Sequence, residues 1–188
     1  VRPDRGEVEL DGKPVTRLPM FRRARLGIGY LAQEPSIFRR LTVEENLLAV
    51  AETIRLTRAE RKARIEKMLE ALELAGLRRS SAAVLSGGER RRLEIARSLL
   101  TEPRLLLLDE PFAAIDPIAV ADIQEIVLGL RGQGISVLLT DHSVRETLAI
   151  TDRSYIIFEG RILRHGPSAE LVDDPVVRQV YLGEKFRM

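Results

Sequence analysis

The run Leu85-Ser86-Gly87-Gly88-Glu89 has the residue types of a turn that binds phosphate. A serine and two glycines at the start of a helix leave backbone N–H groups open to phosphate oxygens, and the helix N-terminus adds a partial positive charge. Glu89, three residues after Ser86, completes a capping box. Ser-Gly-Gly alone is also an ordinary helix cap, so this run is a candidate phosphate site that needs partners elsewhere in the chain.

Two adjacent carboxylates, Asp109 and Glu110, follow the apolar run Leu105 to Leu108. Four consecutive leucines indicate a central strand, and parallel sheets bind ligands at the carboxyl ends of their strands. Neighbouring residues that leave a strand point in different directions, so one carboxylate can serve a metal ion and the other a water. The alternative interpretation of the pair is a solvent-facing helix cap.

Three further polar side chains follow apolar segments: Gln33, Asp116 and His142. Gln33 comes after Ile28 to Ala32, and His142 comes after Ile135 to Leu139 and Thr140-Asp141. A glutamine or a histidine at a strand end has a structural interpretation when it stands alone. The order of all these groups along the chain therefore matters more than any one of them.

Composition excludes several classes of protein. The 188 residues include 30 basic and 28 acidic side chains, so a net charge of +2 gives little electrostatic reason to bind nucleic acid. The chain has no cysteine, which excludes disulfides and thiolate metal sites. No apolar stretch approaches the roughly 20 residues that span a bilayer. We expect a soluble, intracellular protein of one domain, residues 1–188.

Apolar strands alternate with helical patterns along most of the chain, which indicates an α/β fold with a mostly parallel sheet and helices on both faces. Capping boxes at Thr42 and Thr57 predict two helices inside an inserted helical subdomain at about 34–84. A hairpin is expected at 154–164, and a helical tail at 167–188. On the helix after Ser86, the three arginines 90–92 spread over different faces, so one should point inward and the others into solvent.

Taken in order, Gln33, the run Leu85 to Glu89, Asp109-Glu110, Asp116 and His142 resemble the motifs of the ATP-binding cassette (ABC) family, which has a P-loop NTPase-like fold. The resemblance covers essentially the whole chain. It implies an ATPase that uses ATP and Mg²⁺ and works as a head-to-tail dimer with a second copy of itself.

The resemblance also implies a role for each residue. Asp109 and Gln33 would support Mg²⁺, Glu110 would orient and polarise the attacking water, and His142 would contact the γ-phosphate. Ser86, Gly87, Gly88 and Glu89 would form the signature motif, which binds a nucleotide held by the other subunit. Asp116 would pass information across the dimer interface, although its loop reads Ala-Ala-Ile-Asp where the family usually has Ser-Ala-Leu-Asp.

Three segments resemble one branch of the family, whose members power lipopolysaccharide export: Gly29 to Glu34, Ser36 to Val43 and Val180 to Phe186. ATPases of branched-chain amino-acid importers are the nearest alternative. Within the second segment, Phe38, Arg39 and Arg40 would receive a coupling helix from integral membrane transporter subunits. The ATPase would then lie in the cytoplasm, peripheral on the inner face of the cytoplasmic membrane. A core phenylalanine in an ordinary loop is the alternative for Phe38.

The sequence lacks one expected motif, G-x-x-x-x-G-K-[ST], which cradles phosphates in this class of ATPase. The nearest candidate, Gly12-Lys13, is followed by Pro14 and has Glu7 at the position of the first glycine. The chain also begins at Val1, so we expect the N-terminal part of a longer protein to be missing and the isolated chain to bind ATP poorly and to be inactive. A soluble ABC protein that acts on ribosomes or DNA is the competing functional class.

Overall fold

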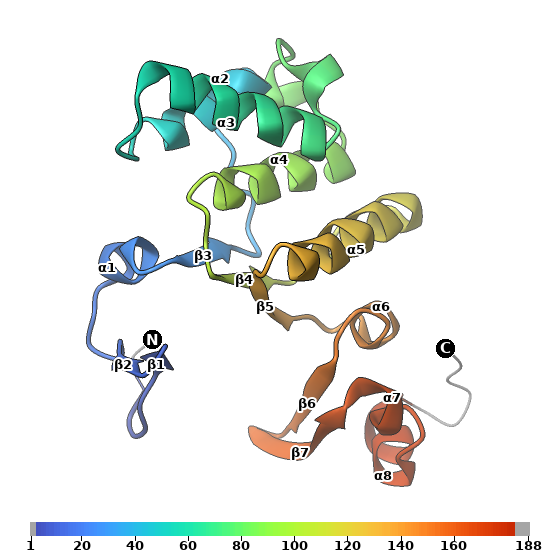
Figure 1. The fold of residues 1–188 in the computed structure, drawn as a ribbon. Coiled ribbons are helices and arrows are strands. Elements are labelled where there is room, and N and C mark those ends of the chain that lie inside the picture. The colour runs from blue at the N-terminus through green and yellow to red at the C-terminus, as the bar shows by residue number, and fades with distance from the viewer. Residues whose placement is uncertain (1–2, 183–188) are drawn as a thin grey trace.

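The computed structural model describes residues 3–182 and centres on a three-stranded sheet. Its strands are β3 (Ile28–Leu31), β4 (Leu105–Asp109) and β5 (Ser136–Thr140), in the order β3-β4-β5. Both pairings are parallel, with Leu31 opposite Leu108 and Asp109 opposite Thr140. The three strands therefore end at one edge of the sheet, where the polar segments that follow them meet (Figure 1).

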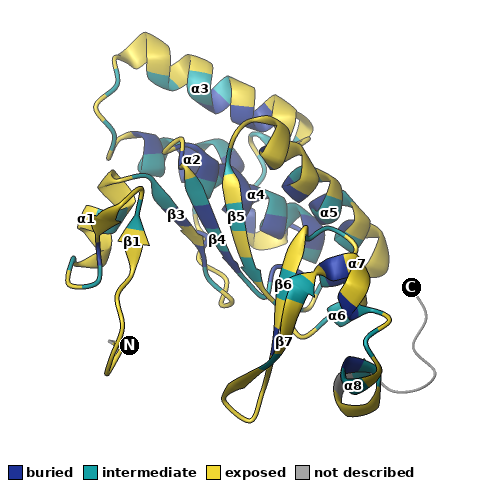
Figure 2. Cartoon of the chain, turned by 60° about the horizontal axis from the view of Figure 1, so that its bottom comes forward, coloured by how far each residue is buried: buried dark blue, intermediate teal, exposed yellow. Residues whose placement is uncertain are grey.

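Helices α4 (Gly87–Leu99) and α5 (Pro117–Gly132) pack against one face of this sheet (Figure 2). Leu106 and Leu108 of β4 are buried, as are Leu93 and Ile123 of the two helices. On the other face Tyr30 and Leu138 are 50% and 58% exposed. The expected cover of both faces by helices is thus seen on one face only in residues 3–182, while the α/β fold with a parallel sheet is confirmed.

A helical segment separates β3 from β4 in the chain. It contains α2 (Val43–Ala51), α3 (Arg58–Ala71) and the 3-10 turns η1 (Ala75–Leu77) and η2 (Ala82–Val84). Thr42, Thr57 and Ser86 each form a complete capping box at the start of α2, α3 and α4. The buried side chains of this segment join the same apolar cluster as β4 and α5. Its treatment as a separate inserted subdomain stays a prediction.

Removal of the two threonine caps should weaken the helical segment and change how it responds to acid. The backbone N–H of Thr42, with its hydroxyl second, holds the pKa of Glu45 below its ordinary value of 4.5, and the hydroxyl of Thr57, with its N–H second, does the same for the pKa of Glu60. A carboxyl with a lowered folded-state pKa stabilises the fold above its unfolded pKa, and that contribution disappears as the pH falls through the folded-state pKa. We expect Thr42→Val and Thr57→Val each to lower the unfolding free energy by about 1 kcal/mol at neutral pH.

The measurement is urea unfolding followed by circular dichroism between pH 7 and pH 3. Thr57→Val should lose less stability than the wild type over this range, because the Thr57 hydroxyl is the main cause of the lowered pKa of Glu60. Thr42→Val should differ less from the wild type, because the backbone N–H that mainly holds Glu45 is still present. Thr42→Ser and Thr57→Ser, which keep the hydroxyl, are the matched controls. An acid response of Thr57→Val equal to that of the wild type would contradict the expected role of its hydroxyl.

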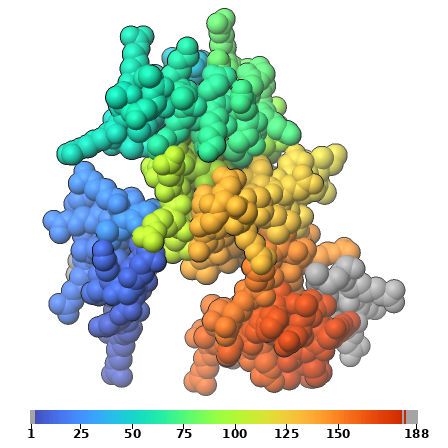
Figure 3. Space-filling model, viewed as in Figure 1, coloured from blue at the N-terminus to red at the C-terminus, as the bar shows by residue number. Residues whose placement is uncertain are grey.

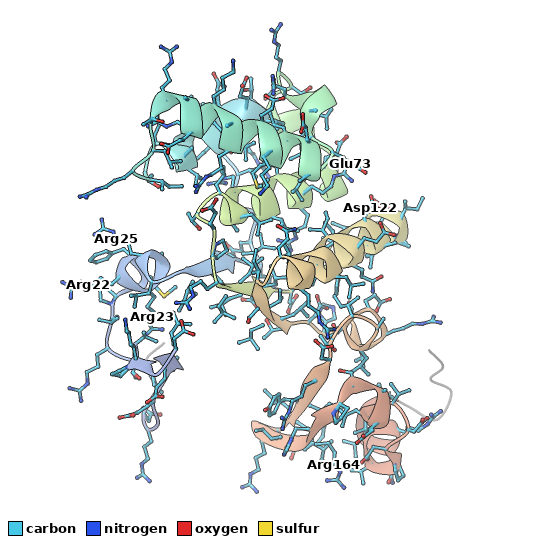
Figure 4. All side chains as sticks on the ribbon, in the orientation of Figure 1. Arg22, Arg23, Arg25, Glu73, Asp122 and Arg164 are labelled. Carbon is cyan, nitrogen blue, oxygen red and sulfur yellow. The ribbon has the colours of Figure 1, made fainter. Side chains whose placement is uncertain are left out.

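The N-terminal residues form a lobe beside β3 (Figure 3). It holds the short antiparallel pair β1 (Glu9–Leu10) and β2 (Lys13–Pro14) and the helix α1 (Met20–Arg25). The sequence did not predict α1, which buries none of its residues and has no side-chain cap. Its three arginines, Arg22, Arg23 and Arg25, are labelled in Figure 4. Without a cap or a buried face, the helix has neither of the sequence patterns by which a helix is usually predicted.

The C-terminal part is a second lobe. It contains α6 (Val144–Leu148), the antiparallel hairpin β6 (Arg153–Phe158) and β7 (Arg161–Pro167), α7 (Ser168–Leu171), α8 (Pro175–Val177) and the π-helical turn η3 (Arg178–Leu182). Ile156, Leu171 and Val177 form a small core of their own. The hairpin is confirmed. Gly183 to Phe186, part of the tail used for the branch resemblance, lie outside the described residues.

None of the helices described between residues 3 and 182 combines the length and the apolar character needed to cross a bilayer.

Candidate functional site

Asp109 is the last residue of β4, and its carboxylate is held by both neighbouring strands. The Thr140 hydroxyl on β5 donates to Asp109 Oδ1 at 2.7 Å, and the Tyr30 hydroxyl on β3 donates to Oδ2 at 3.3 Å. Partial desolvation, followed by the charge and the hydrogen bond of Asp109, raises the pKa of the Tyr30 hydroxyl above its ordinary value. The tyrosine therefore stays a proton donor, and the Asp109 carboxylate has a fixed orientation.

Glu110 is the point where three predicted site residues meet. Gln33 Nε2 donates to Glu110 Oε2 at 2.9 Å, and His142 Nδ1 lies 3.5 Å from the same oxygen. The Glu110 side chain is 28% exposed and that of His142 is 71% exposed. A carboxylate that is partly open to solvent, and is bounded by an amide donor and an imidazole, can orient a water molecule and accept its proton.

The backbone at Glu110 is unusual, since its φ angle of 46° lies in the left-handed region. Its N–H donates to the Thr140 carbonyl at 2.7 Å, which continues the pairing of β4 with β5 by one residue. A non-glycine residue rarely adopts this conformation unless its surroundings hold it there. The two adjacent carboxylates have different neighbours: Asp109 contacts Thr140 and Tyr30, and Glu110 contacts Gln33 and His142. They can therefore take different roles, as the sequence predicted.

The run Ser86 to Glu89 forms a closed capping network at the start of α4. Ser86 Oγ accepts from the Glu89 N–H at 3.3 Å, and Glu89 Oε2 accepts from the Ser86 N–H at 2.8 Å. The backbone hydrogen bond from Ser86, with its hydroxyl second, lowers the pKa of Glu89. Ser86 is exposed, so its side of the helix end is open to a ligand from outside the subunit.

The two glycines of this run lie against the segment that leads into α5. A Cβ at Gly88 would lie 2.6 Å from the Ala119 Cβ, closer than real Cβ atoms approach. A Cβ at Gly87 would lie 3.3 Å from the Ala114 carbonyl oxygen. Glycine at 88 therefore permits the start of α4 to touch the first turn of α5, a packing reason for that residue besides the chemical one.

Asp116 caps α5, because its Oδ1 accepts from the Ile118 and Ala119 N–H groups at 3.1 and 3.0 Å. This local role is enough to explain an aspartate at the position. Its predicted role at a dimer interface stays a prediction.

Phe38 lies on the surface, which excludes the core interpretation: its exposed fraction is 47%. The buried Asn46 fixes its backbone, accepting from the Phe38 N–H at 2.8 Å and donating to its carbonyl at 3.0 Å. The Arg97 guanidinium lies 4.6 Å from the centre of the Phe38 ring. Arg39 and Arg40 are exposed next to it.

A hollow of about 380 Å³ adjoins this surface, with Phe21, Ser36, Val50 and Arg97 among its lining.

Sequence reasoning missed several residues that build the site. Thr140 is the clearest case, since its hydroxyl reaches Asp109 only because β5 lies beside β4 in register. Asp141 is another: its buried carboxylate accepts from the Phe112 N–H at 3.3 Å and the Ser143 N–H at 2.7 Å, and so ties the loop after Glu110 to the loop of His142. Asn46 is a third case: its side chain holds the Phe38 backbone, eight residues away, and no sequence motif predicts such a contact.

Residues 1–113 match the family model described as ABC transporter. The lipopolysaccharide export system ATP-binding protein LptB of Acidithiobacillus ferridurans is 55% identical over 188 residues, which cover 100% of this chain and 78% of that protein. The protein of the same name from Escherichia coli K12 is 50% identical over 187 residues, covering 98% and 77%.

Solved structures give the same result at the level of the fold. The ADP conformation of an ATP-binding cassette of an ABC transporter matches with a TM-score of 0.84 and 30% identity, covering 98% of this chain and 79% of the other. A dimeric ATP-binding cassette in a post-hydrolysis state, bound to ADP and Pi, matches with a TM-score of 0.76 and 25% identity over 89% of this chain and 75% of the other.

Proposed function

The chain belongs to the ABC transporter family, and from this premise we propose that it is the ATP-hydrolysing subunit of a transporter that exports lipopolysaccharide from the inner membrane. The likeness to two proteins named as LptB, at 55% and 50% identity over nearly the whole chain, supports the substrate. The observation that carries the ATPase activity is the convergence of Gln33 and His142 on Glu110 Oε2.

In the proposed reaction Glu110 orients the attacking water and takes its proton. The Gln33 amide Nε2 holds the carboxylate in place from 2.9 Å away from Oε2. His142 Nδ1 lies 3.5 Å from the same oxygen, and from there the imidazole can contact the γ-phosphate. Enzymes of this type act mainly by positioning the water and the phosphate and by stabilising charge. A carboxylate with defined neighbours at the end of a central strand suits that task.

Mg²⁺ is the metal ion that fits the donors present. Asp109 presents a carboxylate that Thr140 and Tyr30 orient, and Gln33, which donates to Glu110 through Nε2, keeps an amide oxygen that can serve a metal ion. Among residues 3–182 no group of three or more His, Cys, Asp or Glu side chains is placed to hold a metal ion. Mg²⁺ suits such a site, since it uses one or two carboxylates together with phosphate oxygens and water. Asp109 and Gln33 would hold this ion, whose positive charge would offset the negative charge of the phosphates of ATP.

The proposal includes a head-to-tail pair of subunits. Ser86 is exposed at the N-terminus of α4, whose partial positive charge favours phosphate. The Ser86 to Glu89 run takes no part in the hydrogen bonds around Glu110 described above. A phosphate on a nucleotide held by a second copy of the chain would suit this helix end, and a relative of the same fold is known as a dimer.

The surface formed by Phe38, Arg39 and Arg40 is proposed to dock the membrane subunits at the cytoplasmic face of the inner membrane. An exposed aromatic ring with an arginine stacked on it is typical of an interface anchor. We expect Phe38→Ala to lower recovery of the membrane subunits at least tenfold when the ATPase is purified from detergent extracts, since hot-spot truncations cost about 2 kcal/mol or more.

Phe158→Ala is the matched control, because Phe158 is a 40% exposed phenylalanine on the distant hairpin and should leave recovery unchanged. Copurification of the wild type with integral membrane proteins also separates a transporter ATPase from a soluble ABC protein acting on ribosomes or DNA. Recovery with ribosomal or DNA-repair partners instead would refute the proposed function. Identification of branched-chain amino-acid importer subunits in the complex would refute the substrate alone.

A further inference from the structure

We propose that Arg91 is a positioning residue for ATP hydrolysis, which fixes the backbone of Glu110 and ties it to the segment around Gln33. The inference rests on the role proposed above for Glu110. Arg91 is the most buried of the three consecutive arginines on α4, with 5% of it exposed, whereas Arg90 and Arg92 are partly buried.

Three backbone carbonyls accept hydrogen bonds from the Arg91 guanidinium. Nη2 donates to the Glu110 carbonyl at 2.7 Å and Nε to the Pro111 carbonyl at 3.0 Å. Nη1 donates to the Ala32 carbonyl at 3.2 Å. The fork of an arginine thus spans the two loops that carry Glu110 and Gln33, which leave neighbouring strands.

Glu110 needs such support because of its left-handed backbone, with φ at 46°. Its N–H is held by the Thr140 carbonyl at 2.7 Å, and its own carbonyl is held by Arg91. The peptide groups on both sides of the Glu110 Cα are therefore restrained. With one of them released, the residue can relax toward a commoner conformation, which swings its carboxylate away from Gln33 and His142.

Glu94, one turn along α4, completes the arrangement. It is 3% exposed; its Oε2 accepts from Arg91 Nη1 at 3.1 Å, and its Oε1 accepts from the Ser36 N–H at 2.8 Å. The buried pair therefore contacts the chain at Ala32 and at Ser36, on both sides of Gln33. The position of the Gln33 loop and that of the Glu110 backbone depend on the same two side chains.

Geometry, more than charge, is what this role requires. A lysine at 91 keeps the positive charge beside Glu94 but replaces a planar fork by one ammonium group, which cannot reach three separate carbonyls in the same way. We expect Arg91→Lys to lower kcat for ATP hydrolysis by about 10- to 100-fold, because small displacements of a catalytic group have effects of this size. The KM for ATP should change less than twofold, because the hydrogen bonds of Arg91 go to backbone carbonyls and to Glu94 and not to a side chain proposed to hold the nucleotide.

The experiment measures kcat and KM in the assembled transporter, with thermal unfolding of each variant alongside. A second variant, Arg91→Gln combined with Glu94→Gln, removes the fork without leaving a lone buried charge. Arg64→Lys is the matched control, because Arg64 also joins a backbone carbonyl, that of Leu100 at 3.0 Å, and a carboxylate, that of Glu102 at 3.0 Å, away from Glu110. It should lose stability without losing kcat.

A double-mutant cycle decides whether Arg91 acts through Glu110. In a Glu110→Gln background, adding Arg91→Lys should lower single-turnover hydrolysis by less than twofold. The inference is overturned if Arg91→Lys and the double glutamine variant keep kcat within twofold of wild type, or if the losses from Glu110→Gln and Arg91→Lys multiply. Near-normal turnover by Glu110→Gln alone is a different result, which refutes the role of Glu110 itself.

Discussion

Glu110→Gln should slow ATP turnover in the assembled transporter by about 10²–10⁴, the usual contribution of a positioned general base. An amide of the same shape keeps an oxygen that can accept from Gln33, 2.9 Å away in the wild type, but it cannot take a proton from water. ATP binding should be unaffected. The measurement is phosphate release at saturating ATP, together with equilibrium binding of ATP.

Glu125→Gln provides the control, since Glu125 is an exposed carboxylate on α5 with no part in the proposed site. It should leave phosphate release unchanged. Turnover of Glu110→Gln within threefold of wild type would remove Glu110 from the role of base. Loss of ATP binding by the variant would assign the carboxylate to nucleotide binding instead.

The second large effect concerns which subunit completes which site. Ser86→Asp keeps a good helix cap at the start of α4 but adds a negative charge where a phosphate of the partner's nucleotide is expected. Dimers with both Ser86→Asp and Glu110→Gln in one subunit should lose both sites and slow by at least about 10². Dimers with the two changes in opposite subunits should keep one intact site and about half of the turnover, since both lesions then fall on the same nucleotide.

Tagged mixed dimers, purified in both arrangements, carry out this comparison with identical composition. Ser86→Asn, which caps the helix without a charge, separates the electrostatic effect from loss of the cap. Equal turnover in the two arrangements would mean that the signature run does not act on the partner's site.

Much of the fold was predictable because its signals are local. The capping boxes at Thr42, Thr57 and Ser86 depend on residues three apart, and all are present in the structure. The apolar run ending at Asp109 predicted a central strand, and β4 lies between β3 and β5. The helical period predicted one inward arginine with the others in solvent; Arg91 is the buried one, but Arg90 and Arg92 are partly buried as well.

What escaped prediction depends on contacts between distant segments. The cover of the sheet cannot be deduced from four leucines, and in residues 3–182 one face leaves Tyr30 and Leu138 exposed. The helix α1 has no side-chain cap and buries none of its residues, so the usual signals of a helix are missing from its sequence. The left-handed turn at Glu110 and the Thr140 bond to Asp109 arise only once two strands are in register.

The contact between Gly88 and Ala119 limits how these two positions can change over evolutionary time. A methyl group at 88 would fall 2.6 Å from the one at 119, so each residue is tolerated only while the other stays small. Because Asp116 caps the same first turn of α5, a substitution that pushed the helices apart would disturb that cap and the Ser86 run together. A side chain at 88 should therefore occur only together with glycine at 119, whereas glycine at 119 alone creates no clash.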